Sequence, residues 1–257
     1  MITLESLTNK ITKRISDYVE FDVQEIFNQS DYITIYGGAV RDSIANLDIH
    51  DVDILCMSDS AHKLRQYIEN EQGYELLDLY DQDSLNMYKG ISQILEPWTF
   101  MNKNRRIIQI IRPSGYIQNT YQKDLDSAYI DSYTKLLKNV DISACGVFIE
   151  LKDKIMLKES CKNAILHCLS KTFEINKWSS LYNSERTTFR EYKLGNRGWV
   201  SLSSYIDTKN FLLTNRSLKL NNLEFQPEYD YKIWTEDEYK HNVPANDSID
   251  LSDVFFL

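Results

Sequence analysis

Glycine and proline are scarce in this sequence, with 8 and 4 residues among 257. Because both residue types interrupt regular structure, their scarcity indicates a chain that spends most of its length in helices and strands. Apolar residues make up 42% and charged residues 26%, an ordinary globular composition that excludes disorder as a description of the whole chain. The length allows one large domain, or one domain with a smaller second one.

The cysteines show neither a metal-binding pattern nor a disulfide pattern. None belongs to a C-x-x-C pair, which argues against a zinc site, and four thiols spread over the chain do not build a disulfide scaffold. We therefore expect reduced, mostly buried cysteines in a cytoplasmic protein. They are Cys56, Cys145, Cys161 and Cys168.

Long apolar runs are also missing. No stretch approaches the roughly 18 apolar residues of a membrane span, and the charged N-terminal segment lacks the apolar core of a signal peptide. Basic residues are in deficit, since 29 Lys and Arg stand against 38 Asp and Glu, for a net charge of −9. This balance excludes a general nucleic-acid coat, which needs many clustered basic residues, but leaves room for local basic patches.

Strands and helices alternate along the first 150 residues, which predicts an α/β domain. Apolar residues at helical spacing predict one amphipathic helix over about the first 25 residues. Runs rich in β-branched and aromatic residues predict strands at 31–36, 51–57, 74–80, about 91–95, 105–112 and within 140–151. Helical patterns are found at 39–45, 59–71, 124–138 and from about residue 160.

The clearest chemical signal is the stretch from Gly37 to Ile54, GGAVRDSIANLDIHDVDI. Two glycines between a predicted strand and a predicted helix let backbone N–H groups approach an anion closely, and Arg41 adds positive charge for phosphate. Asp51 and Asp53 stand two residues apart on a predicted strand, so both side chains point to one face. Paired carboxylates beside a phosphate cradle suit Mg²⁺ and two-metal phosphoryl transfer.

This pattern, GG-x-V-R-D, then eight residues, then D-x-D, resembles the head domain of class II poly(A) polymerases and CCA-adding tRNA nucleotidyltransferases. These belong to the DNA polymerase β-like superfamily. The resemblance covers about residues 31–155. It implies an α/β (α+β) fold, with a central mixed sheet flanked by helices and a smaller, mainly helical C-terminal region. The chain then divides into an N-terminal helix (1–30), a nucleotidyltransferase head (31–158) and a C-terminal region (159–257).

The resemblance also implies roles for individual residues. Gly37 and Gly38 would hold the nucleoside triphosphate, and Arg41 would support its phosphates or the loop. Asp51 and Asp53 would be catalytic and would bind Mg²⁺ or Mn²⁺. Arg112, at the end of a later predicted strand, is assigned to the nucleotide as well.

A second, shorter resemblance begins at Asp141 (DISACG). It is similar to the family motif R-R-D-F-T-I-N-A, which implies that Asp141 contacts the nucleotide sugar. Asn139 and Val140 stand where that motif has its two arginines. The alternative is that Asp141 caps the end of a strand.

Two departures from the family leave alternatives open. The superfamily commonly supplies a third carboxylate from a later strand, but the centre of the candidate strand carries Gln109, a poorer Mg²⁺ ligand. Either another acid such as Glu96 or Asp141 replaces it, or the second metal is held weakly, or catalysis is lost. The base-selecting motif E-D-x-x-R has no convincing counterpart, so the nucleotide used stays open.

Basic residues recur at helical spacing near the C-terminal third, with Phe189, Tyr192 and Trp199 among them. They form a candidate acceptor-binding stripe of Arg186, Arg190, Lys193 and Arg197. Positive charge interleaved with aromatic rings suits phosphate contact and base stacking. The alternative is a solvated helix face, which charge runs usually are.

Three functions follow from these patterns. The first is metal-dependent transfer of a nucleoside monophosphate from a nucleoside triphosphate to an RNA 3′ hydroxyl, on tRNA or another RNA. The second is the same transfer to a small molecule or a protein. The third is a catalytically silent nucleotide- or RNA-binding relative, for which Gln109 is the best support.

Overall fold

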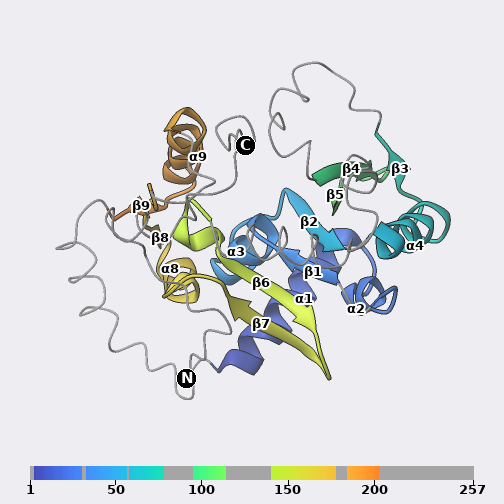
Figure 1. Ribbon diagram of the computed structural model, residues 1–257. Coiled ribbons are helices and arrows are strands. Elements are labelled where there is room, and N and C mark those ends of the chain that lie inside the picture. The colour runs from blue at the N-terminus through green and yellow to red at the C-terminus, as the bar shows by residue number, and fades with distance from the viewer. Residues whose placement is uncertain are drawn as a thin grey trace, which may run out of the picture.

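The computed structural model describes residues 3–30, 33–56, 58–77, 95–113, 140–177 and 184–202. At its centre is a seven-stranded sheet with the strand order β3–β4–β5–β2–β1–β6–β7 (Figure 1). β2 and β5 pair in parallel, and the other neighbouring strands of this sheet pair antiparallel. The expected mixed sheet is therefore confirmed. Its strands are β1 (Ile33–Tyr36), β2 (Asp51–Cys56), β3 (Glu75–Leu76), β4 (Leu95–Met101), β5 (Ile107–Pro113), β6 (Val147–Leu151) and β7 (Ile155–Glu159).

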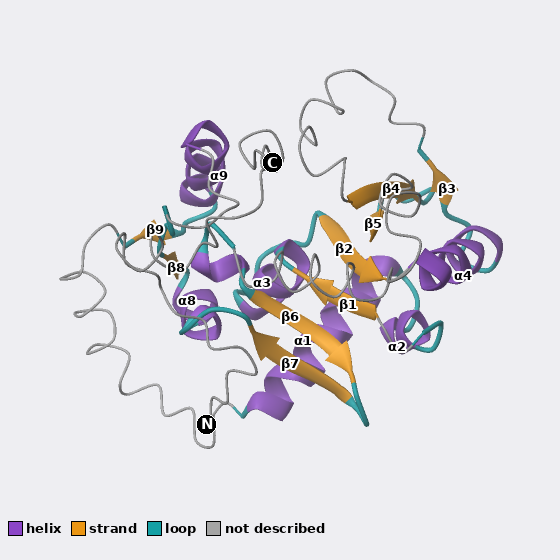
Figure 2. Cartoon of the chain, viewed as in Figure 1, coloured by secondary structure: helices purple, strands orange, loops and turns teal. Residues whose placement is uncertain are grey.

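Helices flank this sheet, and Figure 2 shows α8 and α9 near a second, two-stranded sheet formed by β8 and β9. Among the described helices, none combines the length and the apolar character needed to cross a membrane. These helices are α1 (Leu4–Val19), α2 (Val23–Phe27), α3 (Gly38–Ile44), α4 (Ser58–Asn70), α8 (Ala164–Ser170), α9 (Ser184–Asn196) and the 3₁₀ turn η1 (Ser143–Cys145). The small sheet pairs β8 (Thr172–Phe173) with β9 (Val200–Ser201) in parallel.

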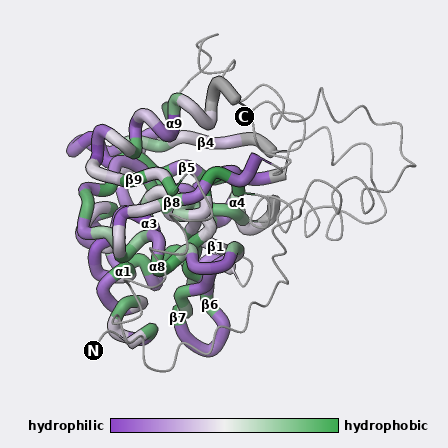
Figure 3. Tube along the Cα trace, turned by 90° about the vertical axis from the view of Figure 1, so that its left-hand side faces the viewer, coloured by the Kyte–Doolittle hydropathy of each residue, from purple (hydrophilic) through white to green (hydrophobic). Residues whose placement is uncertain are grey.

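The two faces of the large sheet have different tasks. Val52, Ile54, Ile108 and Ile110 share one face and are fully buried with apolar residues of α1, α2 and α4. Since side chains alternate along a strand, Asp51 and Asp53 lie on the opposite face. Figure 3 shows hydrophobic and hydrophilic segments mixed along the trace of the described elements. The core therefore fixes β2 in register while leaving its carboxylates on the other side of the sheet.

The predicted single N-terminal helix is wrong, because the segment forms two helices. α1 ends where Glu20 adopts a left-handed conformation with a φ of 68°. Asp22 then begins α2, since its Oδ1 accepts a hydrogen bond from the backbone N of Gln24 at 3.0 Å. An Asp that satisfies a free backbone donor favours a new helix start over continuation of the old helix.

Several predicted strands and helices agree with the structure, and others differ. The structure has strands or helices at the expected places in seven cases: β1, β2, β5, β6, α3, α4 and α9. Asn46, just after α3, has a left-handed φ of 58°. β4 begins at Leu95, where the predicted strand ends, and β7 has no predicted counterpart. The charged turn at 152–154 interrupts the apolar pattern, so the sequence does not indicate the β6–β7 hairpin. The helix expected at 124–138 lies outside the described residues.

The helix predicted from residue 160 is shorter in the structure. Asn163 has a left-handed φ of 64°, so α8 begins only at Ala164. Lys171 is left-handed as well, and Thr172 and Phe173 leave the helix to form β8. The apolar residues whose spacing suggested a longer helix are buried on both sides of these two breaks.

Candidate active site at the glycine turn

The glycine turn connects β1 to α3 and faces β2. Gly37 has a φ of 70°, a conformation that glycine adopts without a steric penalty. Its backbone N donates to the carbonyl oxygen of Val147 at 3.1 Å, which ties the turn to β6. A Cβ atom at Gly37 would lie 3.8 Å from Oδ2 of Asp53, and one at Gly38 would lie 3.7 Å from Oδ1 of Asp51. The structure thus brings both predicted glycines and both predicted carboxylates together.

The two carboxylates lie in a setting that opposes their ionisation. Burial raises the pKa of Asp51, against the opposing effects of Arg41, His50 and Lys193. Burial and the nearby charge of Asp51 raise the pKa of Asp53 to about 8. A divalent cation would remove this penalty, since it neutralises both groups and prefers carboxylate oxygens. Asp51 and Asp53 therefore fit a Mg²⁺ or Mn²⁺ ion that is completed by substrate phosphates.

Gln109 lies on β5, next to Asp53 on the neighbouring strand β2. The two residues are register partners, and Gln109 is in turn the partner of Thr99 on β4. The amide nitrogen of Gln109 donates to Oγ1 of Thr99 at 3.3 Å. A neutral amide thus stands where a third carboxylate would join the pair. Within the described ranges, no group of three or more Asp, Glu, His or Cys side chains is placed to hold a metal ion.

Two acids are candidate substitutes for a third carboxylate. Glu96 is the register partner of Arg112, and its side chain lies outside the described residues. The two oxygens of Asp141 accept hydrogen bonds from α9, one from Thr187 at 2.8 Å and one from Arg190. Asp141 is therefore held by α9 and is not paired with Asp51 or Asp53.

Tyr18 holds the start of β2, a contact that sequence analysis missed. Its hydroxyl donates to the carbonyl oxygen of His50 and accepts from the backbone N of Ile107 at 3.0 Å. The guanidinium of Arg106 lies 5.0 Å from the centre of the Tyr18 ring. This bridge fixes the ends of the parallel strands β2 and β5 directly beside Asp51. Helical spacing marked Tyr18 as a core residue but gave no sign of the bridge.

Arg41 pairs with its neighbour in the motif instead of pointing freely at the carboxylates. Its guanidinium donates to both oxygens of Asp42 at 2.8 and 2.9 Å and to Sγ of Cys145 at 3.2 Å. Burial alone would lower the pKa of Arg41, but Cys145 and Asp42 raise it. Arg41 thus carries a buried charge that is paired with Asp42, and its Nη2 lies 3.8 Å from the ideal Cβ position of Gly38, at the glycine turn.

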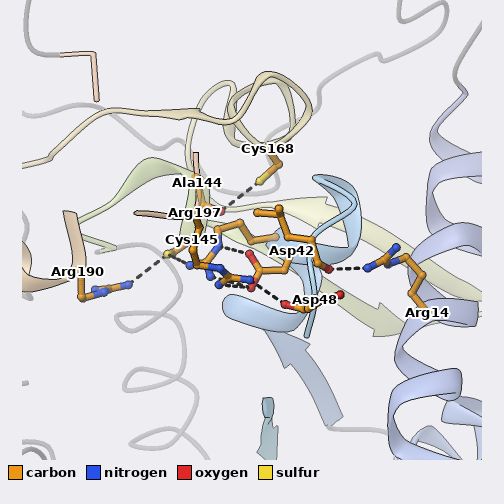
Figure 4. A network of polar contacts seen from close by, with 10 residues as sticks. Arg14, Asp42, Asp48, Ala144, Cys145, Cys168, Arg190 and Arg197 are labelled. Atoms are coloured by element: carbon orange, nitrogen blue, oxygen red, sulfur yellow. Dashed lines mark hydrogen bonds and ion pairs between the residues drawn. The ribbon is translucent and has the colours of Figure 1, made fainter. Parts of the chain in front are cut away.

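Asp42 also binds the C-terminal end of α9. Arg197 donates to Oδ2 of Asp42 at 2.9 Å and to the carbonyl oxygen of Asp48 at 2.7 Å. Figure 4 shows this network, with Arg197, Asp42 and Asp48 at its centre and Cys145 and Arg190 to one side. These contacts of Asp42 reach a helix far along the chain.

The candidate acceptor-binding stripe divides between two directions. Arg190 binds Asp141 and Cys145, and Arg197 binds Asp42, so both guanidiniums point into the protein. Lys193 is exposed, and its ammonium lies 5.7 Å from the centre of the Phe189 ring. The side chain of Arg186 lies outside the described residues.

Arg112 and Asp141 do not join the glycine turn as nucleotide ligands in this structure. Arg112 stacks on Trp98, 4.0 Å from the ring centre, on the sheet face that α4 covers. Asp141 is buried and anchors α9, and its carbonyl oxygen accepts from the backbone N of Asn176 at 2.8 Å. Its side chain binds α9 and, among the described residues, does not cap the end of a strand, and the sugar contact stays a prediction.

Comparisons with known proteins identify the fold and no more. No family model matches the chain, and no curated protein matches it in sequence. Solved structures do match. A CCA-adding enzyme with CTP has a TM-score of 0.52 at 14% identity, covering 84% of this chain and 46% of that one. A CCA-adding enzyme with ATP has a TM-score of 0.53 at 13% identity, covering 82% and 45%.

A third match is the Thermotoga maritima CCA-adding enzyme complexed with tRNA, with a TM-score of 0.50 at 13% identity. It covers 82% of this chain and 44% of that one. The chain thus spans less than half the length of each of these enzymes. The mixed sheet and its flanking helices have the nucleotidyltransferase-like fold of CCA-adding enzymes.

Proposed function

We propose that this protein is a metal-dependent nucleotidyltransferase that transfers a nucleoside monophosphate from a nucleoside triphosphate to an RNA 3′ hydroxyl. The observation that carries the proposal is the approach of the glycine turn to the carboxylate pair, at 3.7 and 3.8 Å from the ideal Cβ positions. The fold likeness supports it, since the matched CCA-adding enzymes include complexes with CTP, ATP and tRNA.

The glycine turn binds the triphosphate in this proposal. The absence of side chains at Gly37 and Gly38 lets phosphate oxygens reach the backbone N–H groups at the start of α3. The same absence keeps the space toward Asp51 and Asp53 free of a methyl group. Arg41 acts indirectly, because its pairing with Asp42 and Cys145 holds the turn and α9 in place.

Asp51 and Asp53 would hold Mg²⁺ or Mn²⁺, which supplies alignment of the attacking hydroxyl and neutralisation of charge on the phosphates. The hydroxyl gives up its proton to water, its oxygen bonds to the α-phosphorus, the bond from that phosphorus to the bridging oxygen breaks, and pyrophosphate leaves. Tyr18 keeps the β2 end that carries Asp51 in register with β5.

The test is label transfer from each of the nucleoside triphosphates, labelled at the α-phosphate, to a pool of RNA, protein or small molecules. An Asp51→Asn/Asp53→Asn double variant serves as control, since it preserves side-chain size and removes the charges. Label in RNA from the wild type alone is the expected result. Label in protein or in small molecules instead would show that the acceptor is not RNA.

Gln109 favours a second candidate, a relative that binds nucleotide without turnover. Because an amide lies beside Asp53, the described site has two carboxylates. Catalysis by two metals needs more negatively charged ligands than nucleotide binding does. This candidate predicts saturable nucleotide binding and no incorporation of label that depends on the carboxylate pair. Incorporation by the wild type alone would exclude it.

A further inference from the structure

The helix α9 presents two different faces. Its inner face carries buried Thr187 and Leu194, together with Arg190 and Arg197, which pair with Asp141 and Asp42. The residues at intervals of three and four on the other side are all exposed. We call these residues the outer face of α9: Phe189, Tyr192, Lys193 and Asn196.

The outer face exposes two large rings that folding does not bury. Phe189 is 60% exposed and Tyr192 is 66% exposed. Leaving such rings largely in water forfeits much of the free energy that their burial would gain. The ammonium of Lys193 lies 5.7 Å from the centre of the Phe189 ring, so a positive charge stands beside the aromatic surface. An aromatic surface with an adjacent cation matches the chemistry of nucleic acid, which has π faces and phosphates.

The outer face is fixed beside the candidate active site. Arg197 ties the end of α9 to Asp42, four residues after Gly38, at 2.9 Å. Trp199, just after α9, lies 5.7 Å from the guanidinium of Arg41. The exposed rings therefore stand on a helix that is bound rigidly to the glycine turn.

We propose that the outer face of α9 is a stacking platform for the unpaired terminal bases of the RNA acceptor. This inference rests on the proposed function and names the form of acceptor that the site takes. Two rings one helical turn apart offer stacking partners to successive bases, whereas a single nucleotide brings only one base. Stacking is tolerant of sequence, because every base has a π face. The platform thus selects single-stranded 3′ ends without reading their sequence.

The experiment measures binding of two fluorescent stem-loop RNAs by polarisation, one with an unpaired 3′ end and one with a blunt end. The variants are Phe189→Leu and Tyr192→Leu, which keep apolar area but remove the ring, with Tyr192→Phe as the conservative replacement. Leu76→Ala on β3 is the control, because Leu76 is also an exposed apolar residue, at 38%. Each protein is first checked for an unchanged thermal unfolding midpoint.

Each leucine variant should weaken binding of the unpaired 3′ end roughly tenfold, while blunt RNA binding and Leu76→Ala stay unchanged. Tyr192→Phe should bind like the wild type. Lys193→Gln should lower the slope of log affinity against log salt by about 0.7, because one phosphate contact is lost. In transfer assays with the two leucine variants, KM for the RNA should rise and KM for the nucleoside triphosphate should stay constant.

Three results would overturn the platform. One is equal binding of both RNAs by the wild type, and another is unchanged binding by both leucine variants. The third is a rise in KM for the triphosphate alone, which would assign the rings to the incoming base. Failure of the proposed function would give a different result. No transfer that depends on Asp51 and Asp53 would be detected, while selective binding of unpaired ends would persist.

Discussion

Replacing Asp42 with asparagine should destabilise the protein more than any exposed charge substitution. The Asp42 side chain is 3% exposed and accepts two hydrogen bonds from Arg41, at 2.8 and 2.9 Å, and one from Arg197 at 2.9 Å. Asparagine keeps the shape and one acceptor oxygen. Its amide group, however, points N–H donors at guanidinium donors, and Arg41 is left as a buried charge without its counterion.

The magnitude follows from the burial of each partner. Breaking a buried ion pair from one side costs about 3–5 kcal/mol, and the oxygen that asparagine retains places Asp42→Asn near 3 kcal/mol. The Arg197 side chain is 23% exposed and remains partly hydrated when released, so its pair with Asp42 contributes about 1 kcal/mol. Asp42→Asn and Arg197→Gln together should therefore fall about 1 kcal/mol short of the sum of their separate effects.

Urea unfolding followed by circular dichroism measures these free energies. Asp17→Asn is the matched control, since Asp17 pairs with Lys13 in the open, with side chains 62% and 75% exposed. The control should change the free energy of unfolding by less than about 0.5 kcal/mol. If Asp42→Asn were no more destabilising than Asp17→Asn, the network would not hold α9 to the glycine turn, and this reasoning would be refuted.

Substitutions at four further positions test the site itself. Gly37→Ala should cost about 1–3 kcal/mol in thermal unfolding, because its φ is 70°. Gly38→Ala should fold normally yet lose nucleotide binding in titrations, because its methyl group would stand 3.7 Å from Oδ1 of Asp51. Gln109→Asp should tighten Mn²⁺ binding measured by calorimetry, whereas Gln109→Asn should not, because only the former adds a charge beside Asp53. Without metal, Asp53→Asn should be more stable than the wild type at pH 8. The pKa of Asp53 rises from 3.8 to about 8 on folding, so its ionisation costs stability as pH climbs through that range, and the advantage should vanish near pH 4 in urea unfolding.

The sequence was sufficient to predict the strands that carry the site. β1, β2 and β5 are rich in β-branched residues, and a period of two placed Asp51 and Asp53 on one face, as the structure confirms. β7 was missed because its residues alternate imperfectly and follow a charged turn. Its place in the sheet comes from pairing with β6, a contact between segments that local patterns do not specify.

The direction of the α9 arginines could not be predicted from the helix alone. Spacing at intervals of four, seven and eleven establishes that residues share a face, but not whether that face looks into water or into the protein. The answer depends on acids far away in sequence. Arg197 pairs with Asp42, 155 residues earlier, and Arg190 pairs with Asp141, 49 residues earlier. Buried charges require partners, and these two acids turn the basic side of α9 inward.

The motif GG-x-V-R-D therefore divides into two parts with different physical tasks. Its glycines face Asp51 and Asp53, where the absence of side chains leaves room for an anion. Its Arg41–Asp42 pair lies beside them, since Nη2 of Arg41 is 3.8 Å from the ideal Cβ position of Gly38, and the pair also holds α9 through Arg197. What α9 then presents outward is aromatic and carries a single described cation, Lys193. On the proposed stacking platform, recognition would therefore depend more on stacking than on charge, in agreement with the net charge of −9.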